Sequence, residues 1–310
     1  MSVLLSRRSA LLAASALPFS VPLLGSAVQA KAAMLGKSTS SFNRIKLGEF
    51  EVTSLLAGTR TVPDPHSIFG TNASMEAFTE AADTAFIPAD KAQFFFTPTV
   101  VNTGSELILF DTGLAGEGIT TALAAAGYKP EDVDVVVLTH MHGDHIGGLM
   151  TNGVPTFANA RYVTGSTEHN FWSAQGNEGF DANVKPFNDK MTFVDDGGSA
   201  AAGITAMMAP GHTPGHMVWL LESAGQRLAI TADTANHYIF SLAYPDWEVS
   251  FDNDKALAAA SRKTVYGMIA ADKIPFIGYH MPFPALGYVE AKDSGFRYVP
   301  ASYQFMLDEG

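Results

Sequence analysis

Four residues able to bind a metal ion stand within six positions near the middle of the chain: His140, His142, Asp144 and His145. They follow the apolar run 133–138, which has the composition of a buried strand. In an extended segment, residues two apart face the same side, so the first two histidines can bind one ion, and the turn at Gly143 directs the other two residues at a neighbouring ion. Three imidazoles and a carboxylate are costly to bury without partners. We therefore interpret this segment as a metal site rather than a core feature or a solvated loop.

The composition restricts the metal chemistry. The chain has 310 residues and no cysteine, which excludes disulfides, thiolate metal sites and a cysteine nucleophile. Any metal must be bound by imidazole and carboxylate, a ligand set that suits Zn²⁺ and also accepts Mn²⁺, Fe²⁺ or Co²⁺. Zinc is the default expectation.

The elements that must position these ligands alternate between strand and helix. Apolar runs at 107–110 and 133–138 predict buried strands on either side of a helix at 119–127. The other expected elements are an opening strand at 44–56, strands at 161–164, 204–208, 217–221, 227–231 and 275–279, and a helix at 254–271. Prolines and aromatic residues at 59–98 predict a long, partly helical excursion near the pocket. We expect one α/β domain, residues 44–310, after a polar linker at 31–43.

The N-terminus resembles a twin-arginine export signal. Arg7 and Arg8 precede the apolar stretch 10–24, and residues 28–30 offer small side chains to a signal peptidase. An uncleaved membrane anchor is the alternative, but prolines interrupt the stretch and the cleavage site follows directly. We therefore expect cleavage near residue 30, export to the periplasm or the exterior, and no stable membrane insertion afterwards.

The charge of the chain excludes one class of partner. The formal net charge is -12, and without residues 1–30 it is -14, from 17 basic and 31 acidic residues. Such a protein repels the backbone of a nucleic acid. We expect a small-molecule substrate and no nucleic acid.

Four motifs, in order, resemble those of the metallo-β-lactamase superfamily. The His-x-His-x-Asp-His motif of residues 140–145 is followed by Pro-Gly-His-Thr-Pro-Gly-His at 210–216, by Asp233 after a predicted strand, and by His280 in Gly-Tyr-His. The resemblance extends over nearly all of the chain after residue 30, and it implies an αββα sandwich with two divalent metal ions. The ligand sets that it implies are His140, His142 and His212 for one ion, Asp144, His145 and His280 for the other, and Asp233 as the bridge between them.

The same resemblance implies a mechanism. Asp144 and Asp233 are predicted to be catalytic as well as metal-binding. A hydroxide that bridges the two ions attacks the substrate carbonyl carbon, and the ions stabilise the oxyanion. A phenolate leaving group needs little protonation, so the lack of an obvious general acid is tolerable.

Other candidate residues have plainer alternatives. Asp111 resembles the aspartate of the superfamily that bonds a ligand histidine and fixes its tautomer, and it is equally a turn residue of Asp-Thr-Gly. His216 is expected to support the site without binding metal. Phe171 and Trp172 line the substrate pocket or, equally, belong to the core. The histidines without ligand spacing, interpreted as surface or core residues, are His66, His169 and His237.

Within the superfamily, the sequence resembles the methyl parathion hydrolase branch, which includes related lactone and aryl ester hydrolases. The shared features are Phe171-Trp172, Phe-Asp-Asn-Asp at 251–254, His-Met-Pro-Phe-Pro at 280–284 and the ending 295–300. The branch resemblance implies a homodimer. Acyl-homoserine lactonases are more distant, because that family has a catalytic tyrosine three residues after its bridging aspartate, where this chain has Asn236.

We predict a binuclear metal-dependent hydrolase of lactones or aryl esters. Phosphotriester hydrolysis is a side activity or the alternative, since the same hydroxide can attack phosphorus. Two other classes stay open: a mononuclear-iron sulfur dioxygenase, and a metal-binding or sensing protein without turnover. True β-lactamases typically lack an aspartate such as Asp233, nucleases favour basic surfaces, and the flavin-iron branch needs a carboxylate in place of His142.

Overall fold

The computed structural model describes residues 33–307. Contacts divide the chain into two units, Met1–Thr39 and Ser40–Gly310. In the first unit, residues 33–39 form no helix or strand, and the predicted export signal, residues 1–30, lies outside the described residues. In the part of the chain that is described, no helix is both long and apolar enough to cross a membrane.

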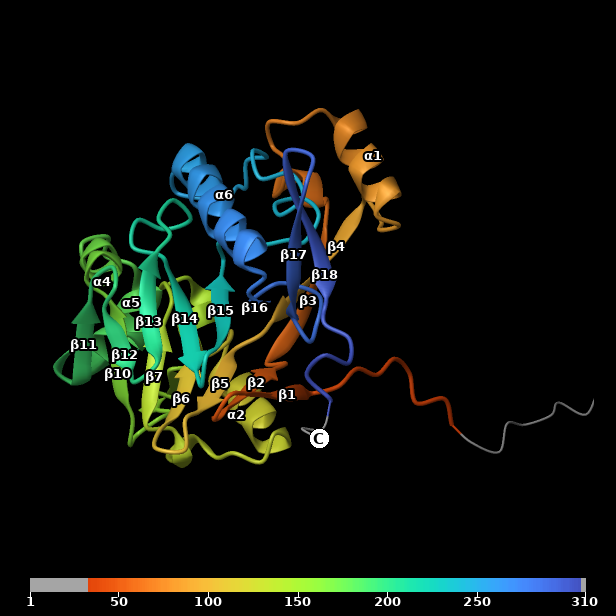
Figure 1. Cartoon of the computed structure of the whole chain (residues 1–310). Helices are drawn as coiled ribbons and strands as arrows, with labels where there is room; N and C mark the ends of the chain where they lie inside the picture. Colours follow the sequence, from red (N-terminus) through yellow and green to blue (C-terminus); the bar gives the residue numbers. More distant parts are fainter. Residues whose placement is uncertain (1–32, 308–310) are drawn as a thin grey trace, which may run out of the picture. The chain divides into compact units, whose positions relative to one another are not determined.

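Two seven-stranded sheets form the centre of the second unit (Figure 1). In spatial order, the first sheet consists of β1 (Phe42–Leu47), β2 (Phe50–Leu55), β5 (Thr99–Asn102), β6 (Leu107–Phe110), β7 (Val135–Leu138), β10 (Arg161–Gly165) and β11 (Met191–Val194). The second consists of β12 (Ser199–Ala201), β13 (Ile204–Met208), β14 (Met217–Ser223), β15 (Gln226–Ala232), β16 (Phe276–Gly278), β17 (Leu286–Lys292) and β18 (Gly295–Pro300). Because β6, β7, β10 and β11 run parallel, their carboxyl ends share one edge of the first sheet.

The remaining elements lie around these sheets. The α-helices are α1 (Met75–Thr84), α2 (Gly116–Ala125), α3 (Gly143–Ile146), α4 (Ser166–Ser173), α5 (Glu178–Asn183) and α6 (Lys255–Asp272). The short 3-10 helices are η1 (Pro65–Ser67), η2 (Pro130–Asp132) and η3 (Lys185–Lys190). Two small sheets pair β3 (Gly58–Pro63) with β4 (Lys91–Phe96) and β8 (Met150–Thr151) with β9 (Val154–Pro155).

The residues of β7 show how the sequence builds the layers. Val135 and Val137 belong to the core between the two sheets, whereas Val136 and Leu138 belong to a second core beneath α2, because alternate side chains of a strand point to opposite faces. On the other side of the second sheet, α6 packs against β17 and buries Tyr266 (Figure 1). The order of layers is helix, sheet, sheet, helix, so the predicted αββα sandwich is confirmed.

The opening strand predicted at 44–56 is wrong, because the chain reverses within it. β1 and β2 pair as an antiparallel hairpin in which Leu47 lies opposite Phe50. Gly48 in the turn has φ +58°, and a Cβ there would lie 2.2 Å from the backbone oxygen of Ser223. Glycine meets both requirements. The apolar residues resume at Phe50, one position out of phase with Ile45 and Leu47, and this shift marks the turn that the strand prediction passed over.

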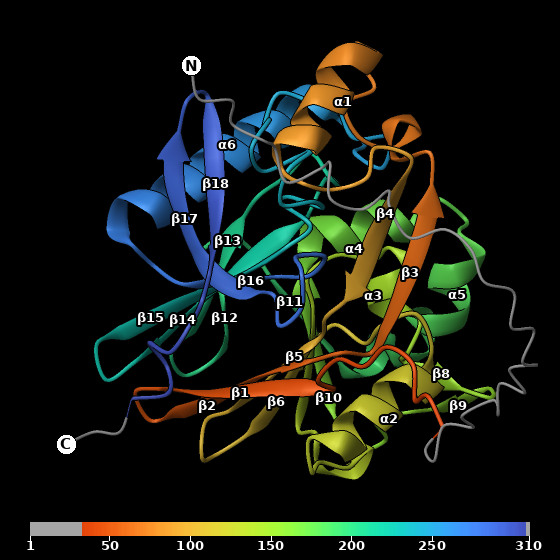
Figure 2. The ribbon, with the colours of Figure 1, turned by 90° about the vertical axis from the view of Figure 1, so that its right-hand side faces the viewer.

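The segment 59–98, predicted as a partly helical excursion, contains two helices and also two paired strands. α1 and η1 lie between β3 and β4, which pair antiparallel with Arg60 opposite Phe94. We call this two-stranded sheet the arm (β3, Gly58–Pro63, with β4, Lys91–Phe96). Figure 2 shows the two strands side by side, apart from the main sheets. The arm follows β2 directly and leads back into β5.

Trp219 provides a test of the core between the sheets. Its side chain is fully buried, and its ring meets the ring of Phe110 edge to face with centroids 6.0 Å apart. Because Trp219→Ala leaves a large cavity, we expect it to lower the free energy of unfolding by about 3–5 kcal/mol, measured by urea denaturation. The control is Phe86→Ala at a side chain that is 96% exposed, with an expected change below about 0.5 kcal/mol. Equal losses in the two variants would contradict this account of the core.

Candidate metal centre

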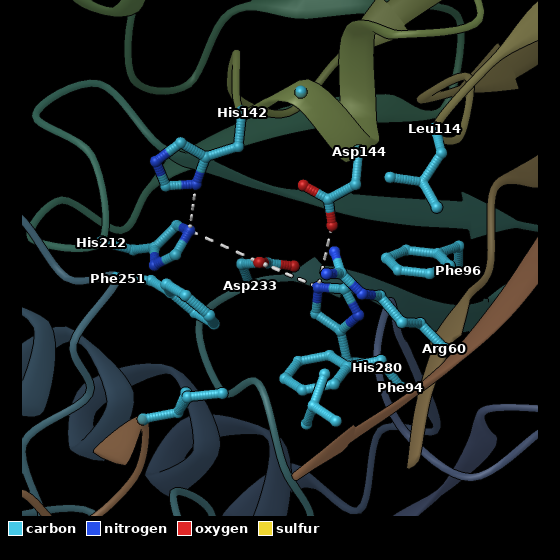
Figure 3. A pocket seen from close by; sticks show the side chains of 13 residues that line it. Arg60, Phe94, Phe96, Leu114, His142, Asp144, His212, Asp233, Phe251 and His280 are labelled. Carbon is cyan, nitrogen blue, oxygen red and sulfur yellow. Dashed lines mark hydrogen bonds and ion pairs between the residues drawn. The ribbon is translucent and has the colours of Figure 1, made fainter. Parts of the chain in front are cut away.

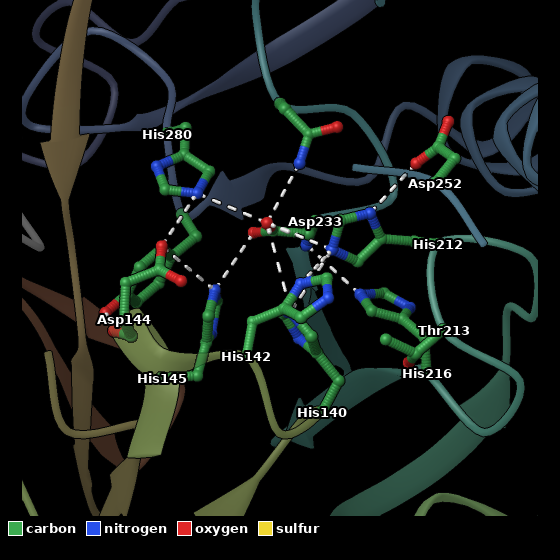
Figure 4. Close-up of polar contacts among 12 residues, drawn as sticks. His140, His142, Asp144, His145, His212, Thr213, His216, Asp233, Asp252 and His280 are labelled. Carbon is green, nitrogen blue, oxygen red and sulfur yellow. Dashed lines mark hydrogen bonds and ion pairs between the residues drawn. The ribbon is translucent and has the colours of Figure 1, made fainter. Parts of the chain in front are cut away.

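Seven side chains converge at the ends of strands from both sheets (Figure 4). They come from four segments: the end of β7 together with α3, the loop between β13 and β14, the end of β15, and the end of β16. In that order they are His140, His142, Asp144 and His145, then His212, Asp233 and His280. The structure therefore brings together every residue that the sequence analysis proposed as a metal ligand.

The ligand atoms form three overlapping groups, and within each group they lie within 4.8 Å of one another. The groups are His140 with His142 and His212, His140 with His145 and Asp233, and Asp144 with His145 and His280. The first and third groups correspond to the two predicted ligand sets, apart from the bridge. The middle group joins them.

Asp233 lies between the two predicted ligand sets. Its Oδ2 lies 3.4 Å from Nε2 of His212 and 3.2 Å from Nε2 of His280, and its Oδ1 lies 3.3 Å from Nε2 of His145. The side-chain amide of Asn236 donates a hydrogen bond of 2.9 Å to Oδ2 and holds the carboxylate in this orientation. A carboxylate placed in this way can bind two ions at once.

Buried polar atoms without partners test whether cations fit here. Among the described residues, Nε2 of His145 and Oδ1 of Asp233 are buried and accept or donate no hydrogen bond. The Nε2 atoms of His140 and His212 face each other at 3.2 Å. Such atoms are costly to bury unless something between them supplies positive charge. Five imidazoles and two carboxylates are ligands that Zn²⁺ and similar ions accept, so the residues fit divalent cations.

The pKa shifts agree with this fit. Burial, and then neighbouring histidines, lowers the pKa of His140 well below its usual value and that of His142 to about 3, so both rings are neutral, as metal-binding imidazoles must be. Burial opposes the charged form of His280, but Asp233 and then Asp144 outweigh it and raise its pKa to about 10. The proton on His280 thus lies among carboxylates that a cation can also neutralise.

Asp111 follows β6, and it has both of the roles expected of it: it bonds a predicted ligand histidine and it forms a turn. One carboxylate oxygen lies 2.8 Å from Nδ1 of His145, so the ring donates to Asp111 and turns Nε2 toward the ligand cluster. Asp111 also accepts the backbone N–H and the hydroxyl of Thr139, each at 2.9 Å. Its φ is +60°, a left-handed conformation typical of a turn.

Asp252 orients the predicted ligand His212. The sequence marked Asp252 only as part of the motif at 251–254. Its Oδ1 lies 2.9 Å from Nδ1 of His212, and its Oδ2 accepts a 3.0 Å hydrogen bond from the buried guanidinium of Arg262 on α6. Arg262 also donates to the backbone oxygen of Thr234, next to Asp233. Asp252 lies just before α6, whose first turn is capped by the side chain of Asp254, so the helix fixes this support.

Glu168, on α4, is a site residue that the sequence analysis missed. One oxygen accepts the backbone N–H of Met141 at 3.0 Å and the indole N–H of Trp172 at 2.7 Å. The other accepts the hydroxyl of Thr213 at 2.7 Å and the backbone N–H of Gly215 at 3.0 Å. Burial raises the pKa of Glu168, against these hydrogen bonds. The residue ties the segment after β7 to the loop of His212, and no spacing pattern in the sequence marks it.

His216 lies beside the cluster and in none of the three ligand groups. Its Nε2 accepts the backbone N–H of Asp233 at 3.1 Å. It therefore supports Asp233 through the backbone, in line with the supporting role expected of it.

An apolar cavity of about 380 Å³ opens onto the cluster (Figure 3). Its floor includes ligands from both sets, among them His142, Asp144, Asp233 and His280. The walls are Arg60, Val62, Ile68, Phe94, Phe96, Leu114 and Phe251. Most of these residues belong to the arm or lie close to it in the chain, so the excursion at 59–98 supplies much of the wall.

Phe171 and Trp172 do not line this cavity. They border a neighbouring surface hollow together with residues 175–179 and Asn253. Trp172 still contacts the cluster from outside, because its ring meets that of His142 edge to face with centroids 5.6 Å apart. The hydrogen bond from its indole to Glu168 holds it there. The aromatic rings that face the predicted ligands from within the cavity are instead Phe94, Phe96 and Phe251.

His237 allows a test of these electrostatics away from the ligands. Its buried ring accepts the backbone N–H groups of Ile239 and Phe240 at Nδ1, both at 3.1 Å, and burial, followed by the charge of His280, lowers its pKa to about 3. Because the unfolded chain takes up this proton near pH 6.5, the folded state loses stability as the pH falls from 6.5 toward 3. In metal-free wild-type protein, this histidine should lower the free energy of unfolding by about 1.4 kcal/mol for each pH unit in that window. We expect His237→Gln to lack this part of the pH dependence, measured by denaturation between pH 7 and pH 5. The control for losing one histidine is His169→Gln, and parallel pH slopes for wild type and His237→Gln would refute the assignment.

Comparison with known sequences gives partial matches to enzymes. The chain is 28% identical over 144 residues to an N-acyl homoserine lactonase of Bacillus cereus, a match that covers 46% of this chain and 55% of that protein. It is 31% identical over 138 residues to an atrochrysone carboxyl ACP thioesterase of Passalora fulva, with 44% and 36% covered. The chain thus spans about half or less of the length of these relatives.

Solved structures match over a larger share. AidC, a dizinc quorum-quenching lactonase in complex with a product, aligns with a TM-score of 0.77 and 27% identity over 86% of this chain and 99% of AidC. The hydrolase AbOPH aligns with a TM-score of 0.79 over 86% of this chain and 100% of AbOPH, and at 24% identity this match bears on the fold alone. Residues 97–267, more than half of the chain, match the metallo-beta-lactamase superfamily. The chain therefore belongs to the metallo-beta-lactamase superfamily.

Proposed function

We propose that this protein is a binuclear metal-dependent hydrolase of lactones or aryl esters. The observation that carries the proposal is the position of Asp233, between two groups of imidazole and carboxylate ligands on the floor of an apolar cavity. The lactonases among its relatives support the same reaction class. Divalent cations held by these residues would supply an activated water molecule and would polarise the ester carbonyl.

The side chains of the protein divide the remaining work. His140, His142 and His212 are proposed to hold one ion, and the second set, Asp144, His145 and His280, the other. Phe94 and Phe96 present aromatic surface to the substrate and exclude water from the floor of the cavity. Such walls accept the ring of an aryl lactone or of an aryl ester without specific hydrogen bonds.

Asn236 distinguishes this proposal from acyl-homoserine lactone hydrolysis. The residue is buried, its side chain is directed at Asp233, and it is not part of the cavity wall. It cannot supply the phenolic hydroxyl that acyl-homoserine lactonases carry at this point. Substrates with a good leaving group, such as a phenolate, need that assistance least.

The metal content tests the binuclear proposal. We expect about two metal ions per chain in protein purified without chelators, measured by elemental analysis. Asp233→Ala removes a ligand shared by both sets, so it should lower the metal content and reduce kcat/KM at least about a hundredfold. Asp246→Ala is the control, because that aspartate forms an exposed ion pair with Lys263. A reproducible single ion, unchanged by added zinc or manganese, would contradict the binuclear site.

The substrate class is tested on a single metal-loaded preparation. The metal site can act on carbonyl carbon and on phosphorus alike, so the cavity must determine which substrate is preferred. No described residue of the cavity wall indicates an adaptation to the bulkier tetrahedral phosphorus. We expect dihydrocoumarin to have a kcat/KM at least about tenfold above that of methyl parathion, roughly 1.4 kcal/mol of differential transition-state binding. The opposite ratio would identify a phosphotriester hydrolase and would leave the metal site in place. Oxygen uptake with a persulfide substrate would identify the dioxygenase class.

A further inference from the structure

Arg60 gives the cavity a charged wall. Among the described residues that line the cavity, it is the one charged side chain outside the predicted metal ligands. The residues that share the wall with it, including Val62, Ile68 and Phe251, are apolar. In Figure 3 the side chain of Arg60 reaches from the arm toward the ligand cluster.

The pairing of the arm explains why Arg60 faces the cavity. Arg60 lies opposite Phe94, and the side chains of a strand alternate between faces. The opposite face of the arm carries Thr61, whose hydroxyl donates a 2.7 Å hydrogen bond to Gln93. Phe94 in turn meets the ring of His280 edge to face with centroids 5.2 Å apart. Arg60 thus pairs across the arm with a residue whose aromatic ring contacts a predicted ligand.

Arg60 also differs from the other described arginines in having no partner. The guanidinium groups that bond a carboxylate, a hydroxyl or a backbone oxygen are those of Arg44, Arg161, Arg227, Arg262 and Arg297. No residue in the described part of the chain forms a hydrogen bond or ion pair with Arg60. The nearby carboxylates Asp144 and Asp233 are directed at histidines instead. The donors of Arg60 are therefore free for a ligand.

We propose that Arg60 binds a carboxylate of the substrate, so that the cavity selects lactones or esters that carry a carboxylate away from the scissile bond. The inference rests on the proposed hydrolase function and names its substrate class. A guanidinium presents two parallel N–H donors to a carboxylate, and the exposed side chain of Arg60 offers these donors beside the apolar residues that line the cavity. Because the protein is acidic overall, with a net charge of -12, long-range attraction does not favour anionic substrates, and the local contact must select them.

Matched ester pairs test the proposal. One pair is mono-4-nitrophenyl glutarate and its methyl ester, with the charge on the acyl group. The other is 4-acetoxybenzoate and its methyl ester, with the charge on the leaving group. For each pair, the ratio of kcat/KM for the anionic to the neutral ester is compared between variants, so that intrinsic reactivity cancels.

We expect Arg60→Gln to lower this ratio at least about tenfold in one pair, mainly through KM of the anionic ester. Arg60→Lys should keep part of the preference, since it retains the charge and loses the paired donors. The control is Lys91→Gln, which removes the same charge from β4 opposite Pro63, on the other face of the arm, and should leave the ratio within about twofold. Unchanged ratios for Arg60→Gln in both pairs would overturn the proposal.

Failure of the proposed hydrolase function can be distinguished from failure of the proposed carboxylate site. If the metal-loaded wild-type protein hydrolyses none of the four esters, the proposed function fails, and titration calorimetry with mono-4-nitrophenyl glutarate then tests Arg60 alone. Weaker binding to Arg60→Gln than to wild type and to Lys91→Gln supports the carboxylate site. Equal binding to all three proteins, or none to wild type, overturns it.

Discussion

The structure depends on one electrostatic constraint: five imidazoles and two carboxylates gather where strands of both sheets end, and all but His142 and Asp144 are buried. Hydrogen bonds do not satisfy this group, since Nε2 of His145 and Oδ1 of Asp233 face each other at 3.3 Å and have no hydrogen-bond partner among the described residues. Bound cations would resolve the conflict, because a cation accepts neutral imidazoles and carboxylates as ligands at the same time. The αββα architecture makes the gathering possible, because it places the ends of β7, β15 and β16 within reach of one another.

Rigid supports keep the ligands in place, and each connects the site to a different layer. Asp111 fixes His145 from the end of β6, and Asp252 fixes His212 through the guanidinium of Arg262 on α6. Glu168 accepts a backbone N–H group from each of two ligand segments, that of Met141 after β7 and that of Gly215 in the loop of His212. These supports are themselves buried polar groups with partners, so the site and the fold stabilise each other.

The sequence predicted which side chains converge, because metal chemistry requires particular residue types at short spacings, as in residues 140–145. It predicted most buried strands because apolar runs such as 133–138 are bounded by turns. It did not reveal the supports, since a lone carboxylate such as Glu168 acquires its role only when distant segments meet. Nor did it reveal the arm, whose aromatic residues are equally consistent with a core or a pocket. The turn at Gly48 was missed as well, because a shift of one residue in the apolar alternation is a weak signal.

The arm has a consequence for how this protein can change. It is inserted between β2 and β5, pairs with neither main sheet, and carries Arg60, Phe94 and Phe96 into the cavity. The predicted ligands all come from elsewhere in the chain. Selectivity and reactivity are therefore encoded in largely separate stretches of the gene. The arm supports the reactive centre through a backbone oxygen, that of Phe95, which lies 2.8 Å from Nδ1 of His280, so side-chain mutations within residues 58–96 can alter which molecules are accepted and leave this support in place.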